Sequence, residues 1–280
     1  MTPVTRGNIP HFLPYQGSKR RLAPAILAAA GPRHFARLFE PFAGSGALTL
    51  AAAHANLADS FVLGDSLQPL ATLWRRALAD PDGLAAAYAA LWQSADYDAA
   101  RTDYNASGNE AALLYLLARC VKNAPRFNQA GHFNQSADQR RRGVGPERLR
   151  QSLRQVAALL HGRCEVQDAD FAQQLTTAGP HDLVYLDPPY QGTSQGRDRR
   201  YHRGLERAQL IDVLEDLNRR RVPFLLSYDG RCGERAFGPP LPAALGLTLL
   251  ELDAGRSSQA TLSGRSEITV ESLYVSPGLR

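Results

Sequence analysis

Apolar residues along this chain gather in short runs that end at polar or turn-forming residues. Runs of four to eight such residues are typical of buried strands, whereas longer stretches with apolar spacings of three and four indicate helices. The alternation of the two patterns predicts an α/β fold with an open sheet. We expect strands near 36–39, 61–64, 164–167, 182–186, 222–227, 247–252 and 267–274, and helices near 20–30, 47–55 and 206–220.

The alternation is interrupted between about residues 69 and 118, where no strand pattern occurs. Leucines and aromatic residues recur there at helical spacing, so we expect amphipathic helices whose aromatic side chains lie in the core. The interruption predicts a mainly helical inserted domain at 73–155, and a core that contains the sheet, made of 1–72 and 156–280.

Composition is consistent with a globular protein of one large domain plus an insertion, since 44% of the 280 residues are hydrophobic and 21% are charged. The formal net charge is +5, which permits an anionic partner without demonstrating one. Nearly all basic residues are arginines, because Lys19 and Lys122 are the two lysines. Arginine forks suit phosphate groups and guanine edges.

The three cysteines are widely spaced, so neither a metal site nor a disulfide framework is predicted. The first residues lack the apolar core of a signal peptide, and no apolar run approaches the roughly 20 residues that span a bilayer. We therefore expect a cytoplasmic protein with no membrane partner, present as a monomer or weak dimer.

A glycine turn follows the first predicted strand, with the sequence Glu40-Pro41-Phe42-Ala43-Gly44-Ser45-Gly46 before a helix. A strand, a Gly-x-Gly turn and a helix N-terminus form a cradle for a nucleotide-like ligand. Thr49 stands where the dinucleotide pattern has its third glycine, which favours an adenosine-bearing ligand without a pyrophosphate. Asp65, at the end of the next strand, is placed to bind ribose hydroxyls, although such an aspartate is also a common helix cap.

The strongest candidate for chemistry is Asp187-Pro188-Pro189-Tyr190, directly after the 182–186 strand. Neither proline donates a ladder hydrogen bond, so the strand stops there and the turn is stiff. The carboxyl end of a strand is where open α/β sheets place their ligands. An acid, a rigid carbonyl and an aromatic face on one turn suit a flat exocyclic amine. The alternative is an ordinary strand-ending turn.

A second candidate is the segment from Phe12 to Lys19, whose Gly17-Ser18 turn precedes a helix. Free backbone N–H groups and one ammonium suit a carboxylate or a phosphate. A solvated lysine at a helix start is an equal alternative for this stretch alone.

Residues 119–154 form the basic part of the insertion, with nine arginine and lysine residues against Asp138 and Glu147. Within it, 126–135 repeats Phe-Asn-Gln around a glycine, which indicates a small hairpin that carries amides. Amides read adenine edges and arginines read guanine or phosphate, so we expect a DNA-binding element; a solvated loop and helix is the alternative.

A polar loop at 191–202 is a candidate lid near the DNA backbone, and 256–265 is a second polar turn.

These motifs together resemble the D12 class of N6-adenine DNA methyltransferases. The segment 12–19, the glycine turn, Asp65 and the Asp-Pro-Pro-Tyr turn stand in the order of the α-group, and the similarity covers nearly the whole chain. Tyr15 stands where the family pattern has tryptophan, and Gln16-Gly17-Ser18 replaces Ala-Gly-Gly. The loop after Tyr190 differs from that pattern in detail.

The resemblance implies a Rossmann-like, seven-stranded methyltransferase core that binds S-adenosylmethionine and acts on double-stranded DNA. It implies catalytic roles for Asp187, Pro188, Pro189 and Tyr190. The implied cofactor-binding residues are Tyr15, Lys19, Glu40, Phe42, Gly44, Gly46, Asp65, Asp170, Phe171 and Asp187. The implied DNA-binding residues are Lys122, Asn123, Arg126, Asn128, Asn134, Arg140, Arg141, Arg142, Arg199 and Tyr201. A cognate restriction endonuclease encoded nearby, without direct contact, is a further expectation.

Several other functions remain alternatives. N4-cytosine methylation uses the same geometry, although an aspartate at the head of the turn favours adenine. C5-cytosine methylation needs a nucleophilic cysteine, usually after proline, whereas each cysteine here follows an arginine. Protein-glutamine and RNA methyltransferases usually carry an asparagine-led turn and no large insertion. A non-catalytic DNA-binding module would tolerate loss of Asp187, and the incomplete glycine pattern weakens a nicotinamide dehydrogenase.

Overall fold

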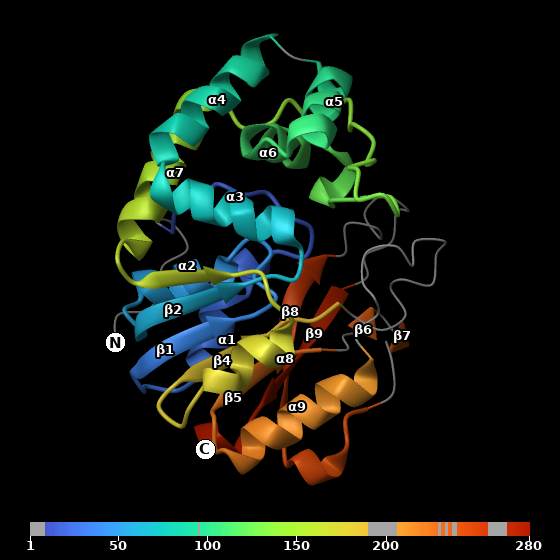
Figure 1. Cartoon of the computed structure of the whole chain (residues 1–280). Coiled ribbons are helices and arrows are strands. Elements are labelled where there is room, and N and C mark those ends of the chain that lie inside the picture. Colours follow the sequence, from blue (N-terminus) through green and yellow to red (C-terminus); the bar gives the residue numbers. More distant parts are fainter. Residues whose placement is uncertain are drawn as a thin grey trace.

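The structure is a computed structural model that describes residues 9–94, 96–189, 206–228, 231–232, 235–236, 240–256 and 268–280. A helical part stands above a sheet that is covered on both faces, as Figure 1 shows. Tyr190, Arg199 and Tyr201, together with the loop at 191–202 and most of the 256–265 turn, lie outside the described residues.

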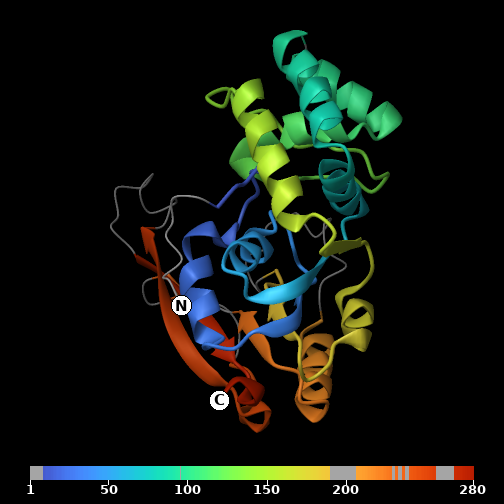
Figure 2. The same cartoon turned by 90° about the vertical axis from the view of Figure 1, so that its left-hand side faces the viewer.

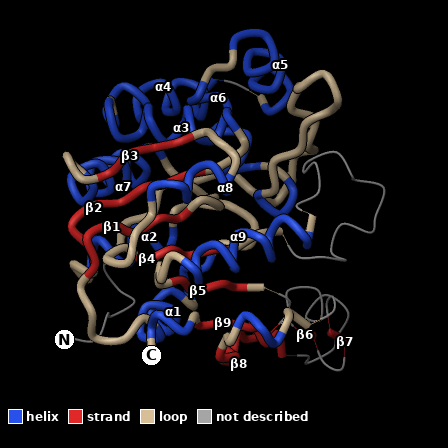
Figure 3. The backbone as a smooth tube through the Cα atoms, turned by 60° about the horizontal axis from the view of Figure 1, so that its bottom comes forward, coloured by secondary structure: helices blue, strands red, loops and turns tan. Residues whose placement is uncertain are grey.

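In the part of the chain that the structure describes, the sheet contains seven strands of four or more residues in the order β3-β2-β1-β4-β5-β9-β8, which Figure 3 shows from end to end. Strands β1 to β5 are parallel, and β9 runs antiparallel between β5 and β8. Two further strands of two residues each extend the sheet: β6 pairs with β9, and β7 pairs with β6. The bounds are β1 (Phe35–Glu40), β2 (Ala58–Gly64), β3 (Cys164–Gln167), β4 (Leu183–Leu186), β5 (Phe224–Ser227), β6 (Arg231–Cys232), β7 (Arg235–Ala236), β8 (Thr248–Arg256) and β9 (Ile268–Val275).

This strand order, with one antiparallel strand inserted near the end of a parallel sheet, is the Rossmann-like methyltransferase fold, and it confirms the predicted fold class. All seven expected strands are present, within three residues of their predicted starts. The pair β6 and β7 was not predicted, because two residues are too few to carry a periodic pattern.

Each central strand is buried on both faces, as parallel strands between helices must be. In β4, Leu183 and Tyr185 belong to one buried cluster, whereas Val184 and Leu186 belong to the other. The first face is covered by α1 (Ala23–Ala29), α2 (Ala47–His54) and α7 (Pro146–Leu160), and the second by α8 (Phe171–Gln174) and α9 (Arg207–Arg219). Figure 2 shows the sheet between these two layers. The short 3₁₀ turns are Lys19–Arg21, Val121–Asn123, Leu175–Thr177, Ala243–Leu245 and Pro277–Leu279.

The helical part consists of α3 (Gln68–Ala79), α4 (Pro81–Ser94), α5 (Tyr97–Ser107) and α6 (Glu110–Arg119), followed by an irregular segment and α7. The expected domain boundaries at 73 and 155 fall inside α3 and α7, and both helices share one buried cluster with the sheet. Trp74 and Tyr88 are fully buried, as the helical spacing predicts. Trp92 is an exception at 38% exposed, and its indole N–H donates to the Arg142 carbonyl at 3.1 Å.

The segment between α6 and α7 includes residues 120–142, which we call the basic turn. Within it lies the small hairpin that was predicted at 126–135. Phe127 and Phe133 pair across it as an antiparallel bridge, and both rings pack on Tyr104 of α5. The Asn105 side chain holds the Phe133 backbone, since its amide donates to the carbonyl at 3.1 Å and its oxygen accepts from the N–H at 2.7 Å. The hairpin is therefore fastened to the helices by a buried aromatic cluster.

Within the described residues, no helix is both long and apolar enough to cross a bilayer.

Candidate active site

The carboxyl ends of the parallel strands bring the predicted residues to one edge of the sheet. Phe39 of β1 is in register with Val62 of β2 and with Val184 of β4. Because parallel strands end together, Glu40, Asp65 and Asp187 follow at the same edge. Glu40 and Asp187 are far apart in the chain, yet they lie within electrostatic reach, and the charge of Asp187 helps to raise the pKa of Glu40.

The glycine turn requires its glycines. Gly44 and Gly46 have φ angles of 48° and 60°, in the left-handed region that favours glycine. A Cβ on Gly46 would lie 2.7 Å from the Trp74 ring, and one on Gly44 would lie 3.0 Å from the Tyr15 ring. The Trp74 indole also donates to the Gly44 carbonyl at 3.1 Å. The turn is therefore packed between two aromatic rings, Trp74 from α3 and Tyr15 from the segment 12–19.

Glu40 supports this turn from below. It is 3% exposed, and its carboxylate accepts from the Thr49 N–H at 2.8 Å in the first turns of α2. Burial raises its pKa to about 7. Because the Glu40 carboxylate is buried and hydrogen-bonded to α2, it fixes the shape of the glycine turn. Its contact with a cofactor remains a prediction.

Asp65 connects the ends of β1 and β2. One carboxylate oxygen accepts from the Gly44 N–H at 3.1 Å and the other from the Leu67 N–H at 2.9 Å. Burial raises its pKa to about 6, and these two hydrogen bonds act in the opposite direction. Asp65 thus joins the glycine turn to the residue that precedes α3. The ribose contact remains a prediction, because a carboxylate oxygen has a second lone pair to offer.

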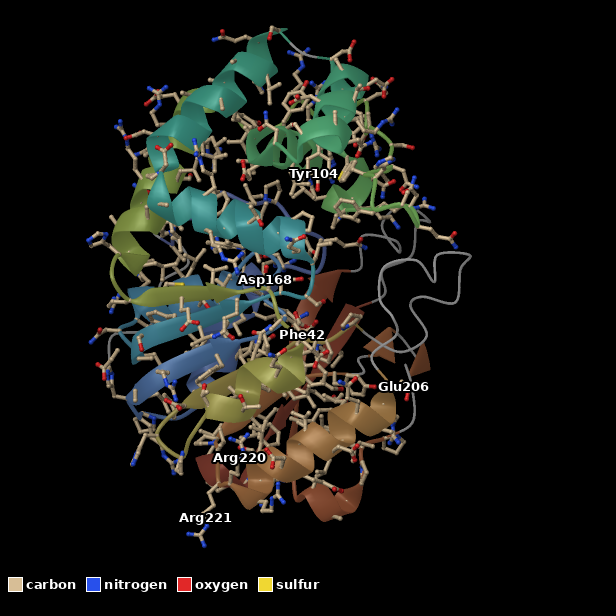
Figure 4. The ribbon with its side chains drawn as sticks, in the orientation of Figure 1. Phe42, Tyr104, Asp168, Glu206, Arg220 and Arg221 are labelled. Atoms are coloured by element: carbon tan, nitrogen blue, oxygen red, sulfur yellow. The ribbon has the colours of Figure 1, made fainter. Side chains whose placement is uncertain are left out.

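An aromatic pair borders the cradle on the α8 side. Phe42 and Phe171 lie with ring centroids 5.1 Å apart and planes inclined by 34°. Phe171 is buried and Phe42 is half-buried; Figure 4 shows Phe42 at the edge of the sheet below the helical part. Asp170 caps α8 by accepting from the Ala172 N–H at 2.9 Å, so its carboxylate is used within the protein.

The Asp-Pro-Pro corner lies where β4 ends. Asp187 is 18% exposed and accepts from the Lys19 ammonium at 2.9 Å. The same ammonium contacts Glu271 of β9 at 2.8 Å, and the side chains of Lys19 and Glu271 are 7% and 12% exposed. Burial raises the pKa of Asp187 to about 6, Lys19 lowers it and Glu271 raises it. We call Lys19, Asp187 and Glu271 the charged corner.

The segment 12–19 joins the charged corner to the glycine turn. Tyr15 packs on Gly44, the Ser18 and Ser45 hydroxyls are 2.7 Å apart, and Lys19 reaches Asp187. A hollow of about 340 Å³ opens beside them, lined by Tyr15, Gly17, Ser18, Lys19, Arg21, Leu22 and Glu271. The two predicted halves of the site therefore share one wall, as an enzyme that joins a cofactor to a substrate requires.

The basic turn shows which of the predicted DNA-binding groups already have partners. The Asn128 side-chain oxygen accepts from the Ala130 and His132 N–H groups, at 2.9 and 3.0 Å. The Asn123 amide donates to the Leu117 carbonyl at 2.7 Å and its oxygen accepts from Arg141 at 2.5 Å. Both amides therefore hold the turn in shape, a use that the Phe-Asn-Gln repeat did not indicate.

The arginines of the turn differ among themselves. Arg140 and Arg141 share the Asp138 carboxylate, at 3.0 and 3.2 Å. Arg142 is exposed and makes no ion pair with any residue in the described ranges. Lys122 and Asn134 are also exposed, and Arg126 is half-buried. Contacts of these residues with DNA remain predictions.

The basic turn also touches the segment 12–19. The Gln16 N–H donates to the Asn123 carbonyl at 3.0 Å, at a point where Lys122 and Asn123 both have positive φ angles, 61° and 52°. A left-handed pair without glycine is uncommon and persists only where the surroundings enforce it. The insertion therefore meets the first segment close to Lys19, the cation of the charged corner.

Glu271 and Trp74 are site residues that sequence reasoning missed. Trp74 was assigned to the helical core by its spacing, which is correct, but its hydrogen bond to Gly44 is a tertiary contact. Glu271 lies in an apolar strand pattern, and a single acid there is the one signal that it faces something charged.

The fold and the edge just described define an α/β methyltransferase. Residues 15–245 match the model of the family described as D12 class N6 adenine-specific DNA methyltransferase, and the chain belongs to this family. This family confirms the predicted class of enzyme, an adenine-specific DNA methyltransferase.

Three curated relatives illustrate the similarity. A DNA N-6-adenine-methyltransferase of Escherichia phage P1 is 28% identical over 69% of this chain, and the match spans 26% of that protein. A retron Ec67 DNA adenine methylase of Escherichia coli is 28% identical over 71% of this chain and 69% of its own length. A type II methyltransferase, M1.LlaDCHI, of Lactococcus lactis subsp. cremoris is 24% identical over 94% of both chains. Among solved structures, yhhF from Escherichia coli aligns with 94% of this chain and 90% of its own, at 17% identity and a TM-score of 0.40, too low to support an inference.

Proposed function

We propose that this protein transfers a methyl group from S-adenosylmethionine to N6 of adenine in double-stranded DNA. The observation that carries the proposal is the placement of Asp187. It lies partly exposed after β4, and the segment 12–19 contacts both Asp187, through Lys19, and the glycine turn, through Ser18. The cofactor at the glycine turn and the amine at Asp187 would therefore lie next to each other, along the segment 12–19.

The residues at the glycine turn fit S-adenosylmethionine. Gly44 and Gly46 let the turn lie directly against the Tyr15 and Trp74 rings, where any side chain would collide, and this fixes the shape of the backbone that would face the ligand. Asp65 offers carboxylate lone pairs for ribose hydroxyls, the half-buried face of Phe42 suits an adenine ring, and Tyr15 and Lys19 suit the methionine end. Asp170 and Phe171 support this platform. When bound, the cofactor supplies an electrophilic methyl group on a sulfonium.

The charged corner would prepare the nucleophile. The lone pair of an adenine amine is delocalised into the ring, so the amine is a poor nucleophile until its N–H groups are held out of the ring plane. The Asp187 carboxylate and the Pro188 carbonyl each accept one N6–H in our proposal, which aims the lone pair and stabilises positive charge that develops on nitrogen. The methylated nitrogen then releases one of these two protons to solvent. Pro189 keeps the corner rigid, because its ring fixes φ.

The target adenine must leave the duplex to reach this corner, which lies at a sheet edge. We assign Tyr190, the next residue along the chain, to stacking on the extruded base, which is worth about 1–3 kcal/mol. We assign the basic turn, with Arg199 and Tyr201 of the loop beyond the corner, to the DNA itself. A monomer or weak dimer suffices for this arrangement. A restriction endonuclease encoded nearby, without direct contact, is the functional companion that we propose.

Nucleoside analysis tests the proposal. Plasmid DNA from a strain without adenine methylation is incubated with the protein and methyl-labelled S-adenosylmethionine, digested to nucleosides and separated by chromatography. We expect the label in N6-methyladenine. Label in N4-methylcytosine would assign the other amine, and a protein that binds DNA but transfers no label would be a DNA-binding module of the same fold.

A further inference from the structure

One ammonium in the charged corner serves two carboxylates from distant parts of the chain. Lys19 begins the first 3₁₀ turn, Asp187 directly follows β4, and Glu271 lies much further on, in β9. The ammonium lies 2.9 Å from Asp187 and 2.8 Å from Glu271. The positive charge of Lys19 is therefore divided between two acids, and neither acid is neutralised by it alone.

This sharing bears on what Asp187 must do. To accept a hydrogen bond from an amine, Asp187 must keep negative charge and release part of its contact with Lys19. A buried cation that loses its partner is costly. With Glu271 in place, Lys19 retains a carboxylate at 2.8 Å while Asp187 turns to the amine. Without Glu271, Lys19 and Asp187 would form a closed pair that the amine has to break.

We propose that Glu271 is a positioning residue for methyl transfer, which holds Lys19 so that the Asp187 carboxylate is available to the target amine. This inference rests on the proposed function. We assign Glu271 a role through Lys19 and no contact with either reactant, so its effect belongs to the chemical step. The binding of cofactor and DNA is left nearly unchanged.

The acid side of the pH profile reports this role. The titratable groups that face Asp187 are Lys19, Glu40 at the end of β1, Tyr185 within β4 and Glu271 on β9. Burial raises the pKa of Asp187 to about 6, and the charge of Glu271 contributes to that rise. Protonation of Asp187 removes the negative charge, so transfer is lost as pH falls through about 6. Removing the charge of Glu271 lowers the pKa of Asp187, which moves this loss to lower pH.

The test is a single-turnover measurement of methyl transfer to unmethylated plasmid DNA between about pH 5 and 8, a range that spans the carboxylate titration, with S-adenosylmethionine and protein in excess. Wild type, Glu271→Gln, Glu271→Asp and Glu251→Gln are compared. Glu251 is an exposed carboxylate on the neighbouring strand β8, so its variant is a matched control and keeps the wild-type rate and profile. Cofactor affinity is measured on the same preparations by calorimetry.

We expect Glu271→Gln to transfer about tenfold more slowly near neutral pH, the order for one charge in a partly buried site. Its cofactor affinity should stay within about twofold, and its acid limb should move to lower pH. Glu271→Asp withdraws the carboxylate by one carbon and should show the same changes, only smaller; it also serves if the glutamine variant fails to fold. A wild-type rate, or a slower rate with an unmoved limb, in both variants would overturn the inference. A wild-type protein that labels no adenine would overturn the proposed function as well.

Discussion

The charged corner and the basic turn are both dense in charge, yet they hold it in opposite ways. In the corner, Lys19 and Asp187 are 7% and 18% exposed and their charged atoms lie 2.9 Å apart. In the basic turn, Arg140 is 83% exposed and shares one carboxylate with Arg141, which is 42% exposed. One region encloses a few charges that depend on one another, and the other displays several charges to solvent.

The difference predicts how each region responds to substitution. A partner removed from a buried ion pair leaves an uncompensated charge, which typically costs about 3–5 kcal/mol. An exposed pair contributes about 0–1 kcal/mol and is screened by salt. Single changes in the corner should therefore have large, specific effects, whereas changes in the basic turn should be small, additive and dependent on ionic strength.

The largest effect is expected for Asp187→Ala. It removes the acceptor of the target amine, so methyl transfer should fall at least about 100-fold, as when one donor or acceptor is removed from a site that stabilises developing charge. Binding of S-adenosylmethionine and DNA should be largely retained, because neither is assigned to this carboxylate alone. Label transfer and equilibrium binding on one preparation check both statements.

The matched control is Asp59→Ala, an exposed aspartate whose side chain is 75% exposed beside His34. It should transfer label at the wild-type rate. Full activity in Asp187→Ala would remove the proposed amine contact.

A smaller but clear effect is expected for Gly46→Ala. The new Cβ would meet the Trp74 ring at 2.7 Å and a Leu63 methyl at 3.0 Å, at a φ angle that disfavours alanine. Overpacking of this kind costs about 1–3 kcal/mol, and the backbone strain adds to it. Urea unfolding should show this loss, and calorimetry should show weaker binding of S-adenosylmethionine.

Gly108→Ala separates the two causes. Gly108 has a φ angle of 71°, and a Cβ added there would meet nothing within 4 Å, so its variant suffers the strain alone. We expect it to lose less stability than Gly46→Ala and to bind the cofactor normally. Equal losses in the two variants would show that the clash with Trp74 is unimportant.

The smallest effects are expected in the basic turn. Replacing Arg140, Arg141 and Arg142 together should weaken DNA binding and reduce the slope of log K against log salt by up to about 0.9 for each phosphate that is no longer neutralised. Among single variants, Arg142→Ala should lose more affinity than Arg140→Ala, because Arg140 must first leave Asp138. Fluorescence anisotropy of a labelled duplex at several salt concentrations measures both.

Arg221→Asn is the control for the removal of positive charge. Arg221 lies at the opposite end of the molecule from the insertion, as Figure 4 shows, and asparagine tolerates its positive φ angle of 57°. Its salt slope should equal that of the wild type. A wild-type slope in the triple arginine variant as well would move the DNA contact away from the basic turn.

The residues at the edge of the sheet could be predicted from the sequence because the patterns that specify them are local. The strand before Asp187, the prolines after it and the Gly44–Gly46 turn each follow from a few neighbouring residues. The spacing of Trp74 likewise predicted a buried face. In each case the backbone preference and the apolar pattern agree with the final fold.

What the sequence concealed depends on contacts between distant segments. Glu271 reaches Lys19 from the far end of the chain, and no local pattern specifies that meeting. Asn123 and Asn128 are predicted to contact DNA, and the sequence did not show that their side chains also hold the turn through hydrogen bonds to neighbouring backbone groups. Trp92 was expected in the core, and its helix carries it to the surface.

The proposed chemistry depends above all on Asp187, which accepts a hydrogen bond from the amine of the extruded base. A double-mutant cycle isolates this contact: wild type and Asp187→Asn are each bound to a duplex with adenine at the methylated position and to one with purine, which lacks the amine. We predict a coupling energy of about 1.5–3 kcal/mol between the carboxylate and the amine, the range for a hydrogen bond to a charged group. A coupling energy of zero would mean that the corner does not hold the amine, and the proposed mechanism would be wrong.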